Sequence, residues 1–294
     1  MTPFHAAHFA PLQAFAPLHA IRFTPLAAIR FTPLAAIPFT PLAAAILFLA
    51  AIVASAIGAM AGGSTLITFP ALVLLGLPSV VANATSTVGM LPTGAGAMVG
   101  HFEDVRKHPR WLSALLLPGL AGGAIGSALL IATPERDFAR IAPYLVLFAT
   151  SLFIVQGALT FRRVSAVPRP PGRVRILVVG AMLFAVAVYD GYFGAGSGIL
   201  MLALLGFLGL SDIHTANGLK GFFVTVINVV ASAYFIARGA VHWPSVAVMV
   251  AGSAIGGYGG ARFARRIGRG PARWTVIAIG LTMTVVLLAR GRKL

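Results

Sequence analysis

From Ala43 to the C-terminus, apolar stretches long enough to cross a membrane follow one another almost without interruption. A helix needs about 20 mostly apolar residues to cross the hydrocarbon layer of a bilayer, which is roughly 30 Å thick. Proline, glycine and arginine residues divide this region into ten elements, at about 43–61, 64–77, 79–100, 111–131, 141–160, 176–192, 196–210, 212–237, 243–262 and 273–290. The chain is therefore predicted to be an all-α polytopic membrane protein.

Two of these elements, 64–77 and 196–210, are too short to cross a bilayer comfortably. A backbone in lipid cannot leave its polar groups unpaired, so short elements are tolerated only inside the protein or beside a water-filled cavity. We expect each of them to be a broken or re-entrant helix. They are the first places to look for a binding site.

Composition narrows the class of protein further. Only 10% of the 294 residues are charged, whereas about a quarter are charged in soluble proteins. Without cysteine the chain has no disulfides, no Cys-based metal site and no thiol chemistry. No His-Glu-x-x-His, Walker A or Gly-x-Ser-x-Gly motif is present, so neither an enzyme, nor a metal, nor a cofactor is predicted.

The segment 1–42 differs from the rest. Four phenylalanines recur every eight residues, each followed two places later by proline: Phe15, Phe23, Phe31 and Phe39. Such regular prolines break any helix long enough to span. We expect a disordered, low-complexity tail without a role in the core function. The alternatives are a membrane-surface or partner-binding arm, or an over-extended start of the coding sequence.

An internal duplication organises the remainder. Gly63-Ser64 and the apolar run after it match Gly196-Ser197 and its run at an offset of 133 residues. At an offset of 134, residues 82–86 match 216–220, and the ladder Pro118, Gly122, Gly126 matches Gly252, Gly256, Gly260. Repeats of this kind are common in transporters. We predict two five-element halves, 43–160 and 176–290, joined by a basic, proline-rich linker at 161–175 and followed by a basic C-terminus at 291–294.

The basic residues orient the chain. If all ten elements cross, the odd number in each half makes the two halves inverted, and the loops 101–110, 161–175 and 262–273 share one side. These loops hold thirteen Lys and Arg residues against six on the other side, so they are predicted to face the cytoplasm. If the short elements only dip in and return, the division becomes twelve to seven, which favours inversion only weakly. The net charge of +16 thus needs no nucleic acid to explain it.

The candidate site lies at two glycine breaks that precede the short elements. Glycine lets the chain turn sharply, and a helix that starts there offers unpaired N–H groups and partial positive charge to an anion. Two such starts, brought together by the duplication, would form one anion cradle. The alternative is that these glycines only permit close helix packing. The predicted binding residues at the breaks are Gly62, Gly63, Ser64, Thr65, Gly194, Gly196, Ser197 and Gly198.

Two ionisable residues, Asp190 and Lys220, lie within or beside apolar elements, where charges are costly and therefore functional hypotheses. Lys220 is predicted to be the countercharge for an anion, helped by Asn217 and, at the matching positions of the first half, by Asn83 and Ser86. Asp190 has three open roles: a structural ion pair with Lys220, a cap for the next helix, or the carrier of a coupling proton.

Three segments resemble one known family: Gly62-Gly-Ser-Thr-Leu-Ile-Thr-Phe-Pro-Ala-Leu72, Ala82-Asn-Ala-Thr-Ser86 and Tyr189-Asp-Gly-Tyr-Phe-Gly-Ala-Gly-Ser-Gly198. Together with the duplication they are similar to the TauE/SafE family, the sulfite exporter and toluene-sulfonate uptake permease group, over about 45–290. The first half departs from it at Ser64-Thr65, where the family often continues its glycines. The resemblance implies a carrier of small, commonly sulfur-containing anions in the bacterial inner membrane.

The predicted function is secondary transport of such an anion by alternating access of the two halves. A passive anion channel is the alternative. The expected partners are the small anionic substrate and membrane lipid, with no nucleic acid, and a homo-oligomer is left open.

Overall fold

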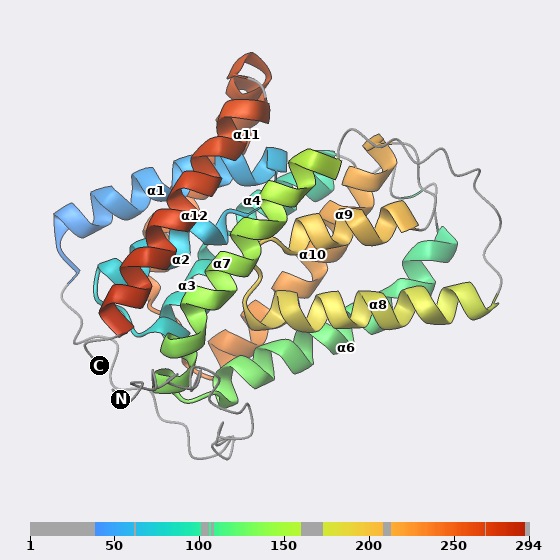
Figure 1. Cartoon of the computed structure of the whole chain (residues 1–294), viewed down its shortest axis with the longest axis horizontal. Coiled ribbons are helices and arrows are strands. Elements are labelled where there is room, and N and C mark those ends of the chain that lie inside the picture. The colour runs from blue at the N-terminus through green and yellow to red at the C-terminus, as the bar shows by residue number, and fades with distance from the viewer. Residues whose placement is uncertain are drawn as a thin grey trace, which may run out of the picture.

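The computed structural model describes residues 39–61, 63–100, 106, 109–159, 173–207, 213–267 and 269–291. Within these ranges the chain is helical, with short turns and no strand. The helices are α1 (Pro41–Ala61), α2 (Thr65–Leu74), α3 (Ser79–Gly89), α4 (Leu91–Gly100), α6 (Pro109–Ala132), α7 (Glu135–Leu159), α8 (Arg173–Tyr192), α9 (Ser197–Phe207), α10 (Ile213–Ala237), α11 (Trp243–Ile267) and α12 (Arg269–Gly291) (Figure 1). Most of the predicted tail, most of the linker and residues 292–294 lie outside the described residues.

The all-helical prediction is confirmed for this part of the chain, and nine of the ten predicted elements correspond to one helix each. The element predicted at 79–100 is instead two helices, α3 and α4, which meet at Met90. Met90 has φ −98° and ψ 3°, outside the helical region, and the next residue but one is Pro92. Proline has no N–H to donate to the preceding turn, and Pro92 lies in the first turn of α4, where no such hydrogen bond is needed.

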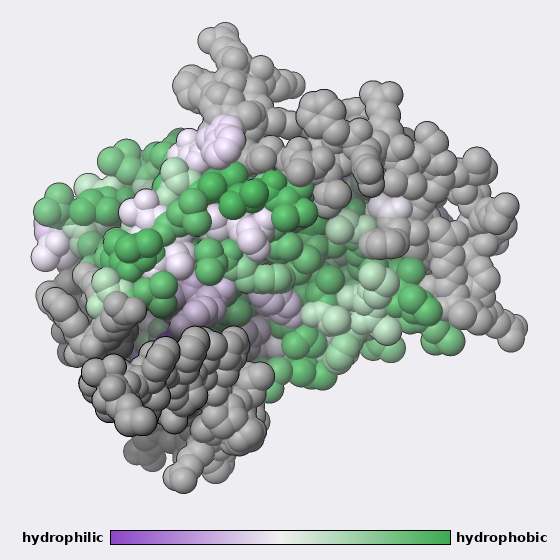
Figure 2. All heavy atoms as spheres, in the orientation of Figure 1, coloured by the Kyte–Doolittle hydropathy of each residue, from purple (hydrophilic) through white to green (hydrophobic). Residues whose placement is uncertain are grey.

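Apolar surface marks the protein as transmembrane. In the described ranges four stretches are long and apolar enough to cross a bilayer: Pro41–Gly58, Leu115–Ala132, Glu135–Gln156 and Thr215–Ala237. Large apolar side chains such as Leu117, Leu177 and Val285 are exposed by 73%, 72% and 67%. Apolar residues cover much of the face in Figure 2. Such a surface suits hydrocarbon rather than water.

The main helix contacts join the two halves of the chain. The most extensive are between α1 and α11 and between α6 and α8, followed by those between α12 and α7. In each pair one helix comes from residues before the linker and the other from residues after it. If α1 corresponds to α8 and α6 to α11, the first two contacts are the same contact with the halves exchanged. The two halves therefore interlock rather than forming separate bundles.

Glycines allow these helices to approach closely. A Cβ atom on Gly122 would lie 2.7 Å from the carbonyl oxygen of Phe184, and one on Gly252 would lie 2.7 Å from that of Phe48. One turn further, Cβ atoms on Gly126 and Gly256 would lie 2.1 Å and 2.2 Å from the carbonyl oxygens of Val188 and Ile52, respectively. Small residues at such positions let helix backbones touch.

If the two halves are repeats, the same contacts give a register that differs from the sequence match. The sequence match pairs Gly122 with Gly256, but by their contacts Gly122 corresponds to Gly252 and Gly126 to Gly256. These pairs are 130 residues apart, one helical turn less than the offset of 134 seen in the sequence. The sequence could not resolve this shift because glycines spaced by four residues match equally well after a slip of one turn.

An aromatic cluster holds the short helix α2 in place. The ring of Phe69 packs edge-on against Phe193, with centroids 5.4 Å apart, and against Phe138 of α7 at 6.2 Å. All three side chains are buried. Because Phe193 lies in the turn between α8 and α9, this cluster fixes α2 relative to the second break.

Candidate functional site

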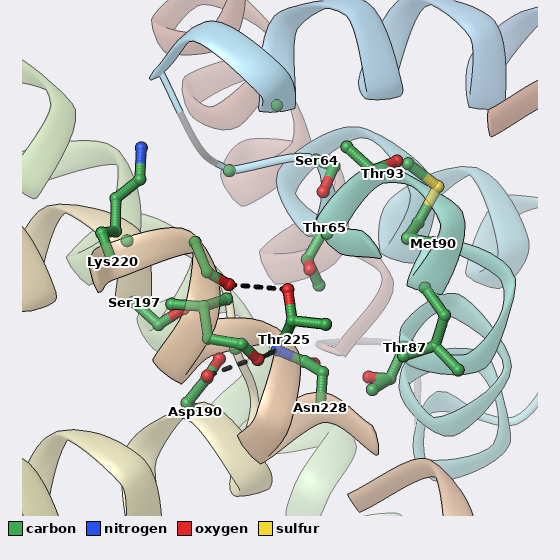
Figure 3. A pocket seen from close by; sticks show the side chains of 18 residues that line it. Ser64, Thr65, Thr87, Met90, Thr93, Asp190, Ser197, Lys220, Thr225 and Asn228 are labelled. Carbon is green, nitrogen blue, oxygen red and sulfur yellow. Dashed lines mark hydrogen bonds between the residues drawn. The ribbon is translucent and has the colours of Figure 1, made fainter. Parts of the chain in front are cut away.

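The two glycine breaks meet at one pocket of about 110 Å³ (Figure 3). The starts of both short helices line it, together with parts of α1, α3, α4, α8 and α10. Eight of the thirteen predicted site residues are on its wall: Gly63, Ser64, Thr65, Asp190, Gly194, Ser197, Gly198 and Lys220. The expectation that the breaks come together is therefore confirmed. Whether these residues bind a substrate stays a prediction.

The glycines at the breaks are needed for the backbone conformation. Gly63, Gly194 and Gly196 have φ values of +87°, +78° and +77°, in the region that other residues rarely adopt. A Cβ atom on Gly63 would also lie 2.3 Å from the ring of Phe153 on α7. A sharp turn and close helix packing were the two alternative reasons for these glycines. Both reasons apply at Gly63.

The supply of free N–H groups at the helix starts is smaller than expected. At the first break the N–H of Leu66 donates to the carbonyl of Gly63 at 3.0 Å, and at the second the N–H of Ile199 donates to Gly196 at 3.0 Å. Ser64 makes no side-chain capping hydrogen bond. The pocket wall therefore offers the hydroxyls of Ser64, Thr65 and Ser197 as additional polar groups beside the helix starts.

Asp190 lies in the last turn of α8 with only 3% of its surface exposed. Its Oδ2 atom accepts a hydrogen bond from Nδ2 of Asn228 at 3.3 Å, and its Oδ1 atom has no hydrogen-bond partner. Asn228 thus occupies the place that the ion-pair hypothesis gave to Lys220. Asp190 belongs to α8 and is therefore not itself the N-cap residue of α9.

Lys220 lines the pocket from the second turn of α10 and is half-buried. In Figure 3 its side chain extends away from Asp190, to one side of the other labelled residues. The two ionisable residues therefore mark different parts of the same wall. A countercharge role for Lys220 stays a prediction.

Asn83 and Ser86 serve packing. The Nδ2 atom of Asn83 donates to the carbonyl of Tyr192 at 3.0 Å, which joins α3 to the end of α8. The Oγ atom of Ser86 lies 2.6 Å from Oγ1 of Thr68, which joins α3 to α2. Both residues are buried beside the pocket and absent from its wall. In this structure Ser86 contacts the short helix α2 and Asn83 contacts the end of α8, and a substrate-binding role for either stays a prediction.

The other predicted residues are also off the wall. Gly196 packs against α7, where an added Cβ atom would lie 3.3 Å from Leu152. Asn217 belongs to the first turns of α10 and does not line the pocket. Gly62 lies outside the described residues.

The sequence reasoning missed several polar residues on the wall: Thr87, Thr93, Thr225 and Asn228. A signal for Asn228 existed, because Lys220, Val224 and Asn228 recur every four residues and so share one face of α10. All three line the pocket. The threonines carried no such signal, since a threonine in an apolar helix commonly bonds its own backbone, as Thr225 does with the carbonyl of Gly221 at 2.6 Å.

Comparison with known proteins gives a consistent picture. A family model described as "Sulfite exporter TauE/SafE" matches residues 47–287. A "Probable membrane transporter protein" of Haemophilus influenzae is 30% identical over 83% of this chain and 94% of its own length. A "Probable membrane transporter protein ORF9" of Sinorhizobium is 25% identical, covering 83% and 92%, and "Probable membrane transporter protein YfcA" of Escherichia coli K12 is 27% identical, covering 83% and 88%. No solved structure matches.

Proposed function

The chain belongs to the sulfite exporter TauE/SafE family of membrane transporters, and from this premise we propose that it is a secondary transporter of a small anion. The family name favours a sulfur-containing anion such as sulfite or an organosulfonate. The three relatives named above come from bacteria. The basic loops suit a cytoplasmic face, so the membrane that we propose is the bacterial inner membrane. No step of the proposal needs enzymatic chemistry.

The observation that carries this proposal is the pocket between the starts of α2 and α9. Each start lies at a break with positive-φ glycines, and the two come from different halves of the chain. Helix starts carry partial positive charge, and the wall adds serine and threonine hydroxyls as well as Lys220. Together these groups suit a compact oxyanion.

We propose that the halves are inverted repeats that rock about this pocket. Support comes from the exchanged contacts, in which α1 packs on α11 as α8 packs on α6, with glycines at matching places. A pocket at the interface of two such halves can open to either side when one half tilts against the other. The same glycine contacts would act as the surfaces that slide or rock.

A counterflow assay tests this function. Purified protein is reconstituted into liposomes loaded with unlabelled sulfite, and uptake of labelled sulfite is followed, with thiosulfate, ethanesulfonate and acetate as competitors. A carrier shows saturable uptake that internal substrate accelerates. A steady conductance without such acceleration would identify the passive channel instead, and no flux of any of these anions would contradict the proposal.

Lys220→Ala tests the countercharge. Two opposite charges about 5 Å apart at an effective dielectric constant of about 20 attract by about 3 kcal/mol, so affinity for the anion should fall by roughly a hundredfold or more. Arg140→Ala is the matched control, because Arg140 is a basic residue 60% exposed beside Asp137 and away from the pocket. Equal affinities in the two variants would remove Lys220 from the site.

A further inference from the structure

The polar residues of the pocket are divided unequally between the two halves. The wall residues contributed by the first half include the hydroxyl groups of Ser64, Thr65, Thr87 and Thr93. Among the described wall residues both ionisable ones, Asp190 and Lys220, come from the second half. The pocket thus has one basic residue, which suits an anion, and one acid, which opposes it. The acid needs an explanation within any account of anion transport.

The surroundings of Asp190 provide little for an ionised carboxylate. Asn228 donates to Oδ2, and its orientation is fixed because the same Nδ2 atom donates to the carbonyl of Val224 at 2.8 Å. A flipped amide would turn its oxygen toward that carbonyl. The hydroxyl of Ser197 is the other polar group beside the carboxyl, and Oδ1 has no hydrogen-bond partner. A buried carboxylate normally has each oxygen hydrogen-bonded or paired with a cation.

An anion in this pocket would lie close to that carboxyl. Asp190 and Lys220 both line this cavity of about 110 Å³, so an anion that Lys220 attracts into it is also exposed to the charge of the carboxylate. Lys220 does not neutralise Asp190, because its side chain extends away from it (Figure 3). At about 5 Å and an effective dielectric constant of about 20, repulsion between two negative charges would weaken binding by roughly a hundredfold or more.

We propose that Asp190 takes up a proton at Oδ1 together with the anion, so that the protein is a proton–anion symporter. This inference rests on the proposed transport function and adds the coupling ion to it. One proton from water on the entry side binds the carboxylate and forms a neutral acid, whose O–H can donate to Ser197 or to the substrate. On the other side the anion leaves and the acid returns its proton to water. Each cycle therefore moves one proton and one anion in the same direction.

The neighbouring elements offer no other described group for this role. Lys220 on α10 is the other ionisable wall residue, and it is the proposed countercharge. Tyr189, next to Asp190 on α8, donates its hydroxyl to the carbonyl of Ala195 at 2.6 Å, and the hydroxyl of Tyr192 lies 3.3 Å from Thr133. The described wall residues from α1, α2, α3, α4 and α9 are glycine, hydroxyl or apolar residues. Proton linkage at this pocket therefore centres on Asp190.

The test measures anion flux and proton flux separately in the same proteoliposomes. Ethanesulfonate is the probe, because it stays ionised throughout the pH range, whereas sulfite takes up a proton itself near neutral pH. The wild-type protein should acidify the liposome interior by one proton for each anion taken up. Its affinity for the anion should fall by about tenfold per pH unit in the range where Asp190 is ionised in the empty protein.

Asp190→Asn should bind ethanesulfonate with an affinity that does not change with pH, and should move it without protons. Asp137→Asn is the matched control, because Asp137 pairs with Arg140 at 3.9 Å, is absent from the pocket wall, and should keep both the pH dependence and the proton flux. If the asparagine variant does not fold, Asp190→Glu should retain coupling with a shifted pH range, and the wild-type stoichiometry still decides. Anion uptake without proton movement in the wild type would overturn the inference alone, whereas absence of any anion flux would defeat the transport function itself.

Discussion

The sharpest structural prediction concerns Gly126, on the face of α6 that touches α8. A Cβ atom there would lie 2.1 Å from the carbonyl oxygen of Val188, and contacts below 3.0 Å essentially never occur. Gly126→Ala must therefore push the two helices apart by about 1 Å, since a backbone carbonyl cannot rotate away as a side chain can. Overpacking of this kind costs about 1–3 kcal/mol, and rigid backbone places Gly126 at the upper end.

Alanine also favours the helical state over glycine by about 1 kcal/mol, which offsets part of this cost. The net loss is then about 2 kcal/mol, or roughly 4–8 °C in the melting temperature at this chain length. Gly256→Ala should behave alike, because its Cβ atom would lie 2.2 Å from the carbonyl oxygen of Ile52 in the corresponding contact. Both variants are compared with the wild type by thermal melting in detergent.

Gly96→Ala is the control, because Gly96 lies within α4 with nothing within 4 Å of the added atom. This variant has only the helical gain and should melt at the wild-type temperature or up to about 4 °C above it. Because the expected shifts in melting temperature have opposite signs, the comparison separates the effect of the helix contact from that of helix propensity. If Gly126→Ala and Gly256→Ala melted like Gly96→Ala, the helices could not approach as closely as described.

Three further predictions concern the supports of the site. Glu135→Gln should lower the melting temperature by about 2–4 °C. The carboxylate of Glu135 accepts hydrogen bonds from the N–H of Ser79 and, at 2.9 Å, from the N–H of Val80, both at the start of α3. An unchanged melting temperature would exclude a capping role for Glu135. Tyr189→Phe removes the hydrogen bond that the Tyr189 hydroxyl donates to the carbonyl of Ala195. The free energy of anion binding should then change several-fold more than the free energy of unfolding, which binding and melting measured together would reveal. Burial lowers the pKa of His242 below its usual 6.5, so the unfolded chain binds more protons than the folded one as the pH falls below about 6.5, and stability should decrease there. His242→Gln should reduce this loss of stability at acid pH. If the loss is the same in the variant, another group causes it.

The sequence predicted the backbone of the site better than its side chains. Glycines before short apolar runs predicted both breaks, because a sharp turn at such a place needs a residue that tolerates positive φ. Proline and glycine act locally, so their effects can be recognised without tertiary structure. The split at Met90 could have been recognised in the same way from Pro92, but the apolar run around it conceals the interruption.

Partner choice among the side chains depends on how helices rotate against one another, which the sequence does not reveal. Asp190 and Lys220 were the obvious charged pair, yet the rotation of α8 and α10 brings Asn228 to the carboxylate and leaves Lys220 elsewhere on the wall. The repeat was equally misleading for Ser86, the counterpart of Lys220. Equivalence of backbone position led to an expected equivalence of role, whereas Ser86 bonds Thr68 and holds α2.

This difference between Lys220 and Ser86 bears on how the two predicted halves would share the proposed transport site. Had both halves kept a charged residue at this position, two like charges would face one small pocket, and each would raise the cost of burying the other. With Lys220 and Asp190 in the second half only, the first half is left to supply hydroxyls and a helix start, groups that contact an anion without a charge of their own to desolvate. In the proposed cycle, rocking of the first half, which supplies only uncharged groups to the pocket, would change access to it. The distance between Lys220 and Asp190 would stay set by the α8 and α10 contacts, so that substrate and proton could be held on one rigid surface.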